Sequence, residues 1–417
     1  MLPGNHANLP PFSLLFFSSK ESNRPIYVPG RAAAETAKTQ DEKEAQEAEE
    51  KRLDEEAKTT EKRVKSLEMM QEKAPRDEHG ELILRRREVH SGRAMTVSTV
   101  EWSVAEKSAS PTSALEQYMW DKEAEVDRFR ERVPLSNLVS QWRLSMVDTT
   151  KPKPRDWIGP VKEAAAGGSF VIIPECKRME PGIGSLRKRY DVMKLTKEFT
   201  LAGVPAIGVN CDGIFFGGSL EDVTQAREGT AKAAMGNSKV VVPPILASDL
   251  VLYPYQLYKI RLAGADAVNL MAAALESKDL IYLTKIAASL QMQTFVTVTS
   301  ARQIETIEAL PAGSVTGLVV SNRNLEDFSF DMTGRQVLDV LSSDAMKRFR
   351  DKNGDDIAVL ADGRVGIVTG QETGGSPQEY IRDLQKAGAM GAVVGAALVP
   401  DENRKSPLEL LLQTSST

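Results

Sequence analysis

The fold is decided by a run of apolar residues that ends in charges: residues 170–178 read FVIIPECKR. A continuous apolar run, in contrast to an alternating one, indicates a strand that is buried on both faces. Comparable runs recur downstream, at residues 206–209, 240–246, 267–271, 294–298, 317–320, 357–361 and 392–395. Together these runs predict eight buried parallel strands.

Helical patterns separate the apolar runs, for example at residues 192–202, 220–234, 255–263, 280–290 and 377–387. Eight strand-and-helix units in roughly 225 residues are what a closed parallel barrel requires. An open, doubly wound sheet is the alternative, but no Gly-x-Gly-x-x-Gly turn follows the first run. The pattern therefore predicts the α/β class and a (β/α)8 TIM barrel.

An extra N-terminal helix is expected before the barrel. Ser113 and Glu116 have the spacing of a capping box, and Pro134 should end the helix that they begin. A second helical stretch is expected from about Asp156. We therefore assign residues 113–417 to the barrel domain.

Residues 1–112 have a different composition. Residues 1–30 are compatible with an organelle-targeting segment, which would mean a plastid location, or with an unstructured tail and a cytoplasmic location. Residues 31–73 are rich in Ala, Glu, Lys, Gln and Arg, which predicts a charged, solvated helix that is partly disordered. A protein partner for residues 31–73 is the alternative. Residues 74–112 are polar and are expected to form a linker.

Composition narrows the range of functions. The 417 residues carry a formal net charge of −5, which gives no basic face for nucleic acid. No run approaches the roughly 18–20 apolar residues that span a bilayer. Cys176 and Cys211 are expected to be small buried thiols. His6, His79 and His90 all precede the barrel, so a His base or a His-ligated metal is not expected there.

Polar residues follow the predicted strands, at the end of the barrel where such folds carry their chemistry. Glu175 and Lys177 alternate along the first strand and should share one face, as catalytic groups or as a structural ion pair. Gly395 follows the eighth strand at an expected helix start, which suits a phosphate. Other candidates at these strand ends are Phe216, Ser248, Thr297, Ser321, Asn322, Arg323, Asp362, Gly363, Arg364 and Ala396.

Five motifs occur in order between residues 113 and 400. They are Trp-x-Lys-Glu-x-Glu-Val at 120–126, Gly-Ser-Leu-Glu-Asp at 218–222, Tyr-Gln-Leu-Tyr at 255–258, Ala-Gly-Ala-Asp-Ala-Val at 263–268 and Asn-Arg-Asn-Leu at 322–325. In these motifs the chain resembles the indole-3-glycerol-phosphate synthase family, in particular its plant and cyanobacterial branch.

The resemblance implies a carboxy-lyase of tryptophan biosynthesis. The family closes an indole ring on a carboxyphenylamino deoxyribulose phosphate, with loss of carbon dioxide and water and without a metal or organic cofactor. Glu175 and Lys177 match catalytic positions, Phe216 matches an aromatic that packs on the substrate ring, and Arg323 matches an arginine that holds the substrate. The remaining matches imply substrate binding by Ser321, Asn322 and Asp362 and phosphate binding by Gly363, Arg364, Gly395 and Ala396.

The chain departs from the family at several of these positions. The family's catalytic Lys falls on Ser248, its Glu at the end of the fifth strand falls on Thr297, and a Ser of its first loop falls on Glu180. Ser321 stands where the family has Asn, and residues 362–364 stand where it has Glu-Ser-Gly. We therefore expect impaired catalysis and a scaffold or interaction role. An active synthase, or an enzyme acting on another phosphorylated substrate, is the alternative.

Overall fold

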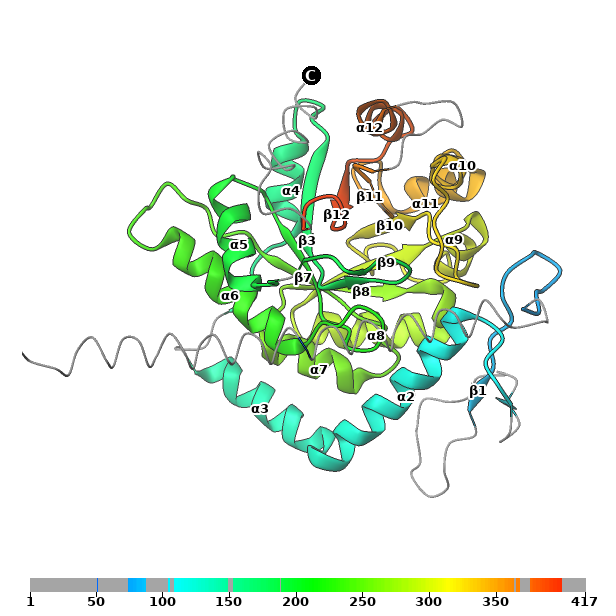
Figure 1. Cartoon of the computed structure of the whole chain (residues 1–417), viewed down its shortest axis with the longest axis horizontal. Helices are drawn as coiled ribbons and strands as arrows, with labels where there is room; N and C mark the ends of the chain where they lie inside the picture. Colours follow the sequence, from blue (N-terminus) through cyan, green and yellow to red (C-terminus); the bar gives the residue numbers. More distant parts are fainter. Residues whose placement is uncertain are drawn as a thin grey trace, which may run out of the picture. The chain divides into compact units, whose positions relative to one another are not determined.

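The computed structural model describes residue 51 and residues 74–87, 104–105, 109–148, 153–187, 189–363, 365–367 and 376–399. Within these residues eight parallel strands close into a barrel in the order β10-β11-β12-β3-β6-β7-β8-β9, with helices around it (Figure 1). The strands are β3 (Val171–Cys176), β6 (Ile207–Asn210), β7 (Ile245–Ser248), β8 (Ala267–Met271), β9 (Gln293–Val298), β10 (Gly317–Ser321), β11 (Ala358–Asp362) and β12 (Gly391–Val394). The predicted (β/α)8 barrel is confirmed.

Helices and short turns connect the strands. They are α5 (Val192–Leu201), α6 (Leu220–Ala234), α7 (Pro254–Ala263), the 3-10 helix η1 (Ala272–Ala274), α8 (Ser277–Ser289), α9 (Ala301–Ile307), α10 (Arg335–Leu341), α11 (Asp344–Asn353) and α12 (Pro377–Lys386). Capping residues set several of these boundaries. Ser219 and Asp222 form a capping box at the start of α6, and Gly264, at φ +110°, ends α7 in the left-handed region.

The barrel interior is filled by side chains that point inward from alternate strand positions, among them Ile173, Leu246 and Leu360. Trp157 stands immediately before α4 (Ile158–Ala165) and packs edge-to-face on Phe295, with ring centroids 4.7 Å apart. The Trp157 and Ile158 amides both donate to the side chain of the first residue of β9. Trp157 therefore closes the amino-terminal end of the barrel.

One strand boundary differs from the prediction. We expected a strand over residues 240–246, but β7 begins at Ile245. Pro243 and Pro244 directly precede it and have no amide hydrogen to donate to a neighbouring strand. Val241 is 75% exposed, so the apolar character of the run did not mean burial at its start.

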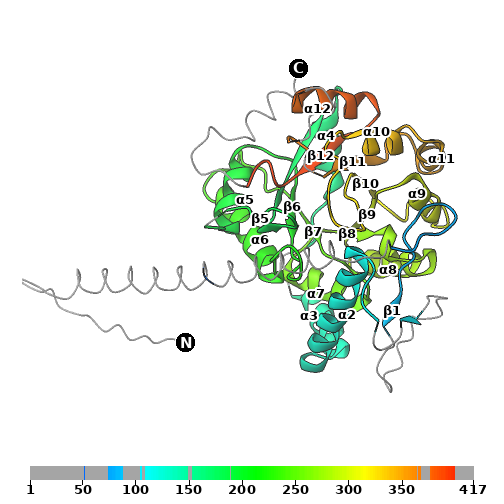
Figure 2. The same ribbon diagram turned by 45° about the vertical axis from the view of Figure 1, so that its right-hand side comes forward.

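The extra N-terminal helix is α2 (Ala114–Arg132), capped by the Ser113 hydroxyl, which accepts from the Glu116 amide. The predicted capping box is wrong in its second half. The Glu116 carboxylate accepts instead from the amides of Thr112 and Arg85. An additional helix, α3 (Leu135–Val147), was not predicted, and it packs beside α7 (Figure 2). Leu144 and other exposed apolar residues of α3 obscured its period.

Residues 74–87, the described part of the predicted linker together with 104–105 and 109–112, pack on the barrel domain. Leu84 is buried against the main core. Arg76 pairs with Glu326 at 2.6 Å, and Arg85 pairs with Glu116 at 2.8 Å. Next along the chain, β1 (Arg86–Arg87) pairs in parallel with β2 (Val104–Ala105). The charged segment predicted over residues 31–73 lies outside the described residues, apart from Lys51.

The chain after β12 differs from the expected helix start. Residues 395–399 form turns, in which the Leu398 and Val399 amides both donate to the Gly395 carbonyl. Cys176 and Cys211 are free and buried, as predicted. Among the helices that the structure describes, none is long and apolar enough to cross a membrane.

Candidate active site

One cavity of about 90 Å³ lies at the carboxyl ends of the strands. It is smaller than the roughly 300–1,000 Å³ of ordinary ligand pockets. The structure brings eight of the sequence-predicted residues to its wall: Glu175, Lys177, Phe216, Ser248, Thr297, Ser321, Arg323 and Asp362. Their catalytic and binding roles stay predictions.

Glu175 and Lys177 share one face of the end of β3, as the alternation predicts. Lys177 Nζ lies 2.8 Å from Glu175 Oε2, and both residues are buried. Burial raises the pKa of Glu175, and the neighbouring Asp362 raises it further, against the attraction of Lys177. Burial disfavours the Lys177 ammonium, but the attraction of Glu175 and Glu180 outweighs it and raises the Lys177 pKa. The Glu175 and Lys177 side chains therefore form a buried ion pair at the end of β3.

A short antiparallel hairpin after β3, β4 (Met179–Glu180) with β5 (Gly184–Ser185), carries a second carboxylate into this group. Glu180 Oε2 lies 3.2 Å from Lys177 Nζ, and Glu180 Oε1 accepts a hydrogen bond from Arg323. Burial alone would raise the Glu180 pKa, but Lys177 and Arg323 lower it to about 2. Glu180 is therefore an anion at neutral pH.

The wall formed by β7, β8 and β9 is neutral. The Asn269 side chain donates to Thr297 Oγ1 at 2.7 Å, and Thr297 Oγ1 donates back to Asn269 Oδ1 at 3.0 Å. Since a hydroxyl can accept through a lone pair while it donates its one hydrogen, Thr297 and Asn269 satisfy each other through two hydrogen bonds. Ser248 adds a second hydroxyl. None of the three side chains can exchange a proton with a substrate near neutral pH as Lys or Glu does.

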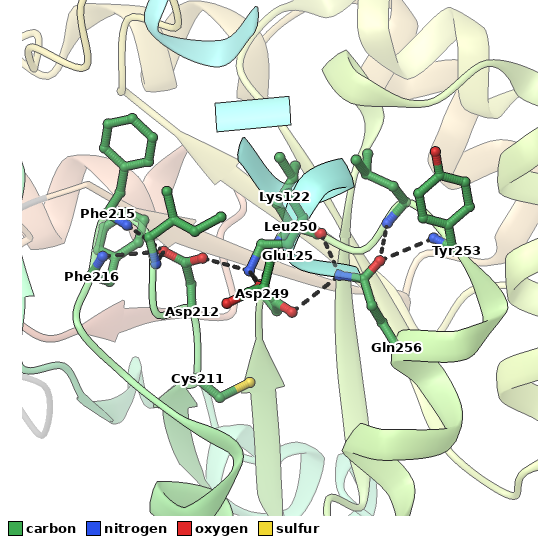
Figure 3. A network of polar contacts seen from close by, with 12 residues as sticks. Lys122, Glu125, Cys211, Asp212, Phe215, Phe216, Asp249, Leu250, Tyr253 and Gln256 are labelled. Atoms are coloured by element: carbon green, nitrogen blue, oxygen red, sulfur yellow. Dashed lines mark hydrogen bonds and ion pairs between the residues drawn. The ribbon is translucent and has the colours of Figure 1, made fainter. Parts of the chain in front are cut away.

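Phe216 is held at the cavity by a carboxylate beneath its loop. Asp212 Oδ2 accepts from the amides of Ile214, Phe215 and Phe216, at 3.1, 2.7 and 3.2 Å (Figure 3). The Phe216 carbonyl accepts from the Met179 amide at 3.1 Å. The backbone that carries the Phe216 ring is therefore fixed by hydrogen bonds within the protein.

Helix α2 supplies the counter-charge for this loop. Lys122 Nζ lies 2.7 Å from each of Asp212, Asp249 and Glu125, and its side chain is 1% exposed (Figure 3). Asp249 follows Ser248 directly and also accepts from Gln256 at 3.2 Å. Burial disfavours the Lys122 ammonium, but the carboxylates raise its pKa well above the usual value. Lys122 thus ties α2 to the ends of β6 and β7.

The other predicted residues do not line this cavity. Asn322 is buried and donates to the Asp331 carbonyl at 2.8 Å. Gly363, at φ +98°, lies so close to Asn322 that a Cβ there would fall 1.7 Å from Asn322 Oδ1. Gly395 is adjacent to the site, since a Cβ there would lie 3.1 Å from Glu175 Oε2. Ala396 is buried next to Gly395, and Arg364 lies outside the described residues.

A groove of about 1,020 Å³ adjoins the cavity, and Thr299, Arg323 and Leu325 line both. Residues 76–84 form its outer wall together with residues of α8 and α9. No cluster of three or more His, Cys, Asp or Glu side chains that could hold a metal occurs in the part of the chain that the structure describes.

Two features of the site were missed from the sequence. Asn269 lies in the middle of the otherwise apolar run 267–271, and this polar interruption was a usable signal. Lys122 was noticed only as part of a motif on α2. Its carboxylate partners Asp212 and Asp249 are far away in sequence, and no local sequence pattern predicts such a contact.

Fold and site together define a (β/α)8 barrel whose carboxyl end holds a charged pair, an aromatic side chain and a buried arginine around one cavity. A sequence model described as indole-3-glycerol phosphate synthase matches residues 115–347. The chain belongs to the indole-3-glycerol phosphate synthase family.

Curated relatives from cyanobacteria agree with this assignment. The chain is 31% identical to the indole-3-glycerol phosphate synthase of Rippkaea orientalis over 303 residues, which cover 73% of the chain and 91% of the relative. It is 30% identical to that of Microcystis aeruginosa, over 75% of the chain and 93% of the relative. The protein of the same name from Trichodesmium erythraeum is 30% identical, over 74% of the chain and 92% of the relative.

Proposed function

We propose that this barrel of the tryptophan-biosynthesis family has lost efficient catalysis of the family reaction while keeping the family's cavity. The observation that supports this proposal is that the cavity wall formed by β7, β8 and β9 carries the neutral side chains Ser248, Asn269 and Thr297. Ser248 and Thr297 line it where the family resemblance places a Lys and a Glu, and Thr297 is hydrogen-bonded to Asn269. A positioned acid or base contributes about 10²–10⁴-fold each. The loss of both would remove about 5 kcal/mol or more of transition-state stabilisation.

The retained groups support a cavity that still binds a small molecule. Glu175 and Lys177 remain paired at 2.8 Å, and Phe216 and Arg323 remain at the wall. The family acts on a phosphorylated substrate, and we propose that this chain binds a phosphorylated ligand too. Gly363, Gly395 and Ala396, on the loops after β11 and β12, are the residues that we propose for its phosphate, together with Arg364.

An active synthase is the second candidate, because the Glu175–Lys177 pair is intact. Lys177 would then have to act as proton donor and Glu175 as acceptor. Burial raises the pKa of Glu175, which makes its carboxylate a stronger proton acceptor than that of an exposed Glu.

For residues 1–73 we propose a plastid-directing segment and a charged helix that engages a protein partner. The composition of residues 31–73 supports this proposal. A fluorescent fusion of residues 1–112 tests the location. Affinity capture with the full chain and with a chain lacking residues 31–73 tests the partner.

Complementation of a tryptophan auxotroph that lacks this synthase tests the proposed loss. We expect no growth with the unmodified chain and growth with the Rippkaea orientalis relative. S248K/T297E should restore slow growth, and more than either single change, since groups of one site act together. Growth with the unmodified chain, at equal protein level, would support the active synthase.

A further inference from the structure

The two cations that line the cavity are already paired inside the protein. Lys177 Nζ lies between Glu175 Oε2, at 2.8 Å, and Glu180 Oε2, at 3.2 Å. Arg323 donates to Glu180 through one nitrogen and to the Phe328 carbonyl, at 3.2 Å, through another. The Glu180 side chain is 1% exposed, so water does not compete for these contacts.

Aromatic rings hold the Arg323 guanidinium in this arrangement. Its central carbon lies 4.2 Å from the ring centroid of Phe330 and 5.4 Å from that of Phe216. Such stacking fixes the plane of the guanidinium and therefore the direction of its donors. Arg323 is thus directed at Glu180, whose carboxylate lies between Lys177 and Arg323.

The remaining charge of the wall is negative. Asp362 lines the cavity, and its carboxylate makes no hydrogen bond or ion pair within the part of the chain that the structure describes. Asp249 also lines the cavity, but Lys122 neutralises it at 2.7 Å. The Asp362 carboxylate is therefore an acceptor at a cavity whose wall also carries hydroxyl and amide side chains, namely Ser248, Asn269, Thr297 and Ser321.

We propose that Glu180 is a specificity-determining residue that occupies the anion position of the cavity. The cavity then binds a small compound that presents hydrogen-bond donors, as an amine or a polyol does, to Asp362. Such a compound carries no anionic group at Lys177 and Arg323. This inference rests on the proposed function only in using the same cavity, and its test measures binding without catalysis.

Binding of small probes to the full chain, followed by calorimetry or ligand-observed NMR, provides the test. Benzoate is the anionic probe, because its ring suits Phe216 and its carboxylate suits Lys177 and Arg323. Ethanolamine and glycerol are the donor probes. For the unmodified chain we expect ethanolamine or glycerol to bind at least tenfold more tightly than benzoate. Preferred binding of benzoate would overturn the proposal, and this comparison needs no variant.

Two variants locate the effect. E180Q removes the resident charge and should tighten benzoate binding at least tenfold, whereas E228Q, on the exposed side of α6, should leave it unchanged. D362N should weaken the donor probe at least tenfold. Unchanged benzoate binding in a folded E180Q protein would overturn the proposal, as would full donor binding in D362N. If E180Q does not fold, the probe comparison on the unmodified chain decides alone.

Discussion

The buried ammonium of Lys122 gives the sharpest stability prediction. In Lys122→Met the helix keeps its length and the apolar stem, but Asp212 and Asp249 lose a contact of 2.7 Å each and keep their charges. Removal of one partner from a buried ion pair costs about 3–5 kcal/mol. At roughly 2–4 °C per kcal/mol, Tm should fall by about 6–20 °C.

The pH dependence of the variant follows from the same charges. The Lys122 pKa is raised in the folded unmodified protein, so its contribution is fully present below the unfolded pKa of Lys and is lost only at high pH. Burial already raises the pKa of Glu125 in the folded protein, against the attraction of Lys122, so removal of Lys122 raises the folded pKa of Glu125 further above its unfolded value. The folded variant then binds more protons than the unfolded chain, and the Tm deficit should shrink from pH 8 to pH 5.

Thermal unfolding at both pH values, followed by circular dichroism, measures these effects. Lys347→Met is the matched control, since Lys347 pairs with Asp344 on the exposed surface of α11. The control should unfold close to the unmodified protein. Lys122→Met with Asp249→Asn should recover part of the loss. A Tm of Lys122→Met within 2 °C of the control would refute the reasoning.

Three further changes test the packing. Trp157→Ala should cost about 3–5 kcal/mol by emptying the amino-terminal end of the barrel, and urea unfolding should show it. Gly334→Ala should lower Tm, because Gly334 has φ +69° and a Cβ would lie 2.3 Å from the Tyr380 ring; an unchanged Tm would mean that α10 shifts freely. Deletion of residues 1–87 should lower Tm more than deletion of residues 1–73, by calorimetry, and equal values would show that the packed segment contributes nothing.

Much of the barrel could be predicted because buried parallel strands leave a local record. Continuous apolar runs located the strands, and the prediction failed at residues 240–244, where Pro243 and Pro244 prevent pairing. The capping spacing of Ser113 was read correctly, but the partner of Glu116 was not. A carboxylate at the third helical position accepts from the strongest donor within reach. Here that donor is Arg85, which only tertiary folding brings next to Glu116.

The site was predictable as far as strand ends define it. The positions of Glu175, Lys177, Thr297 and Arg323 followed from the rule that barrel chemistry sits at the carboxyl ends of strands. The hydrogen bond from Arg323 to Glu180 could not be predicted in this way, because it joins residues 143 positions apart. Sequence comparison with a family identifies a substitution, whereas its consequence depends on which groups the new side chain meets.

The turnover rate of the purified full chain on the family substrate tests the central claim most directly. It should be measured beside the Rippkaea orientalis synthase, in one assay and at saturating substrate. Loss of both proton-transfer groups, at Ser248 and Thr297, predicts a kcat at least about 10⁴-fold below that of the relative. A kcat within tenfold of the relative would contradict the account and show that Glu175 and Lys177 suffice for the chemistry.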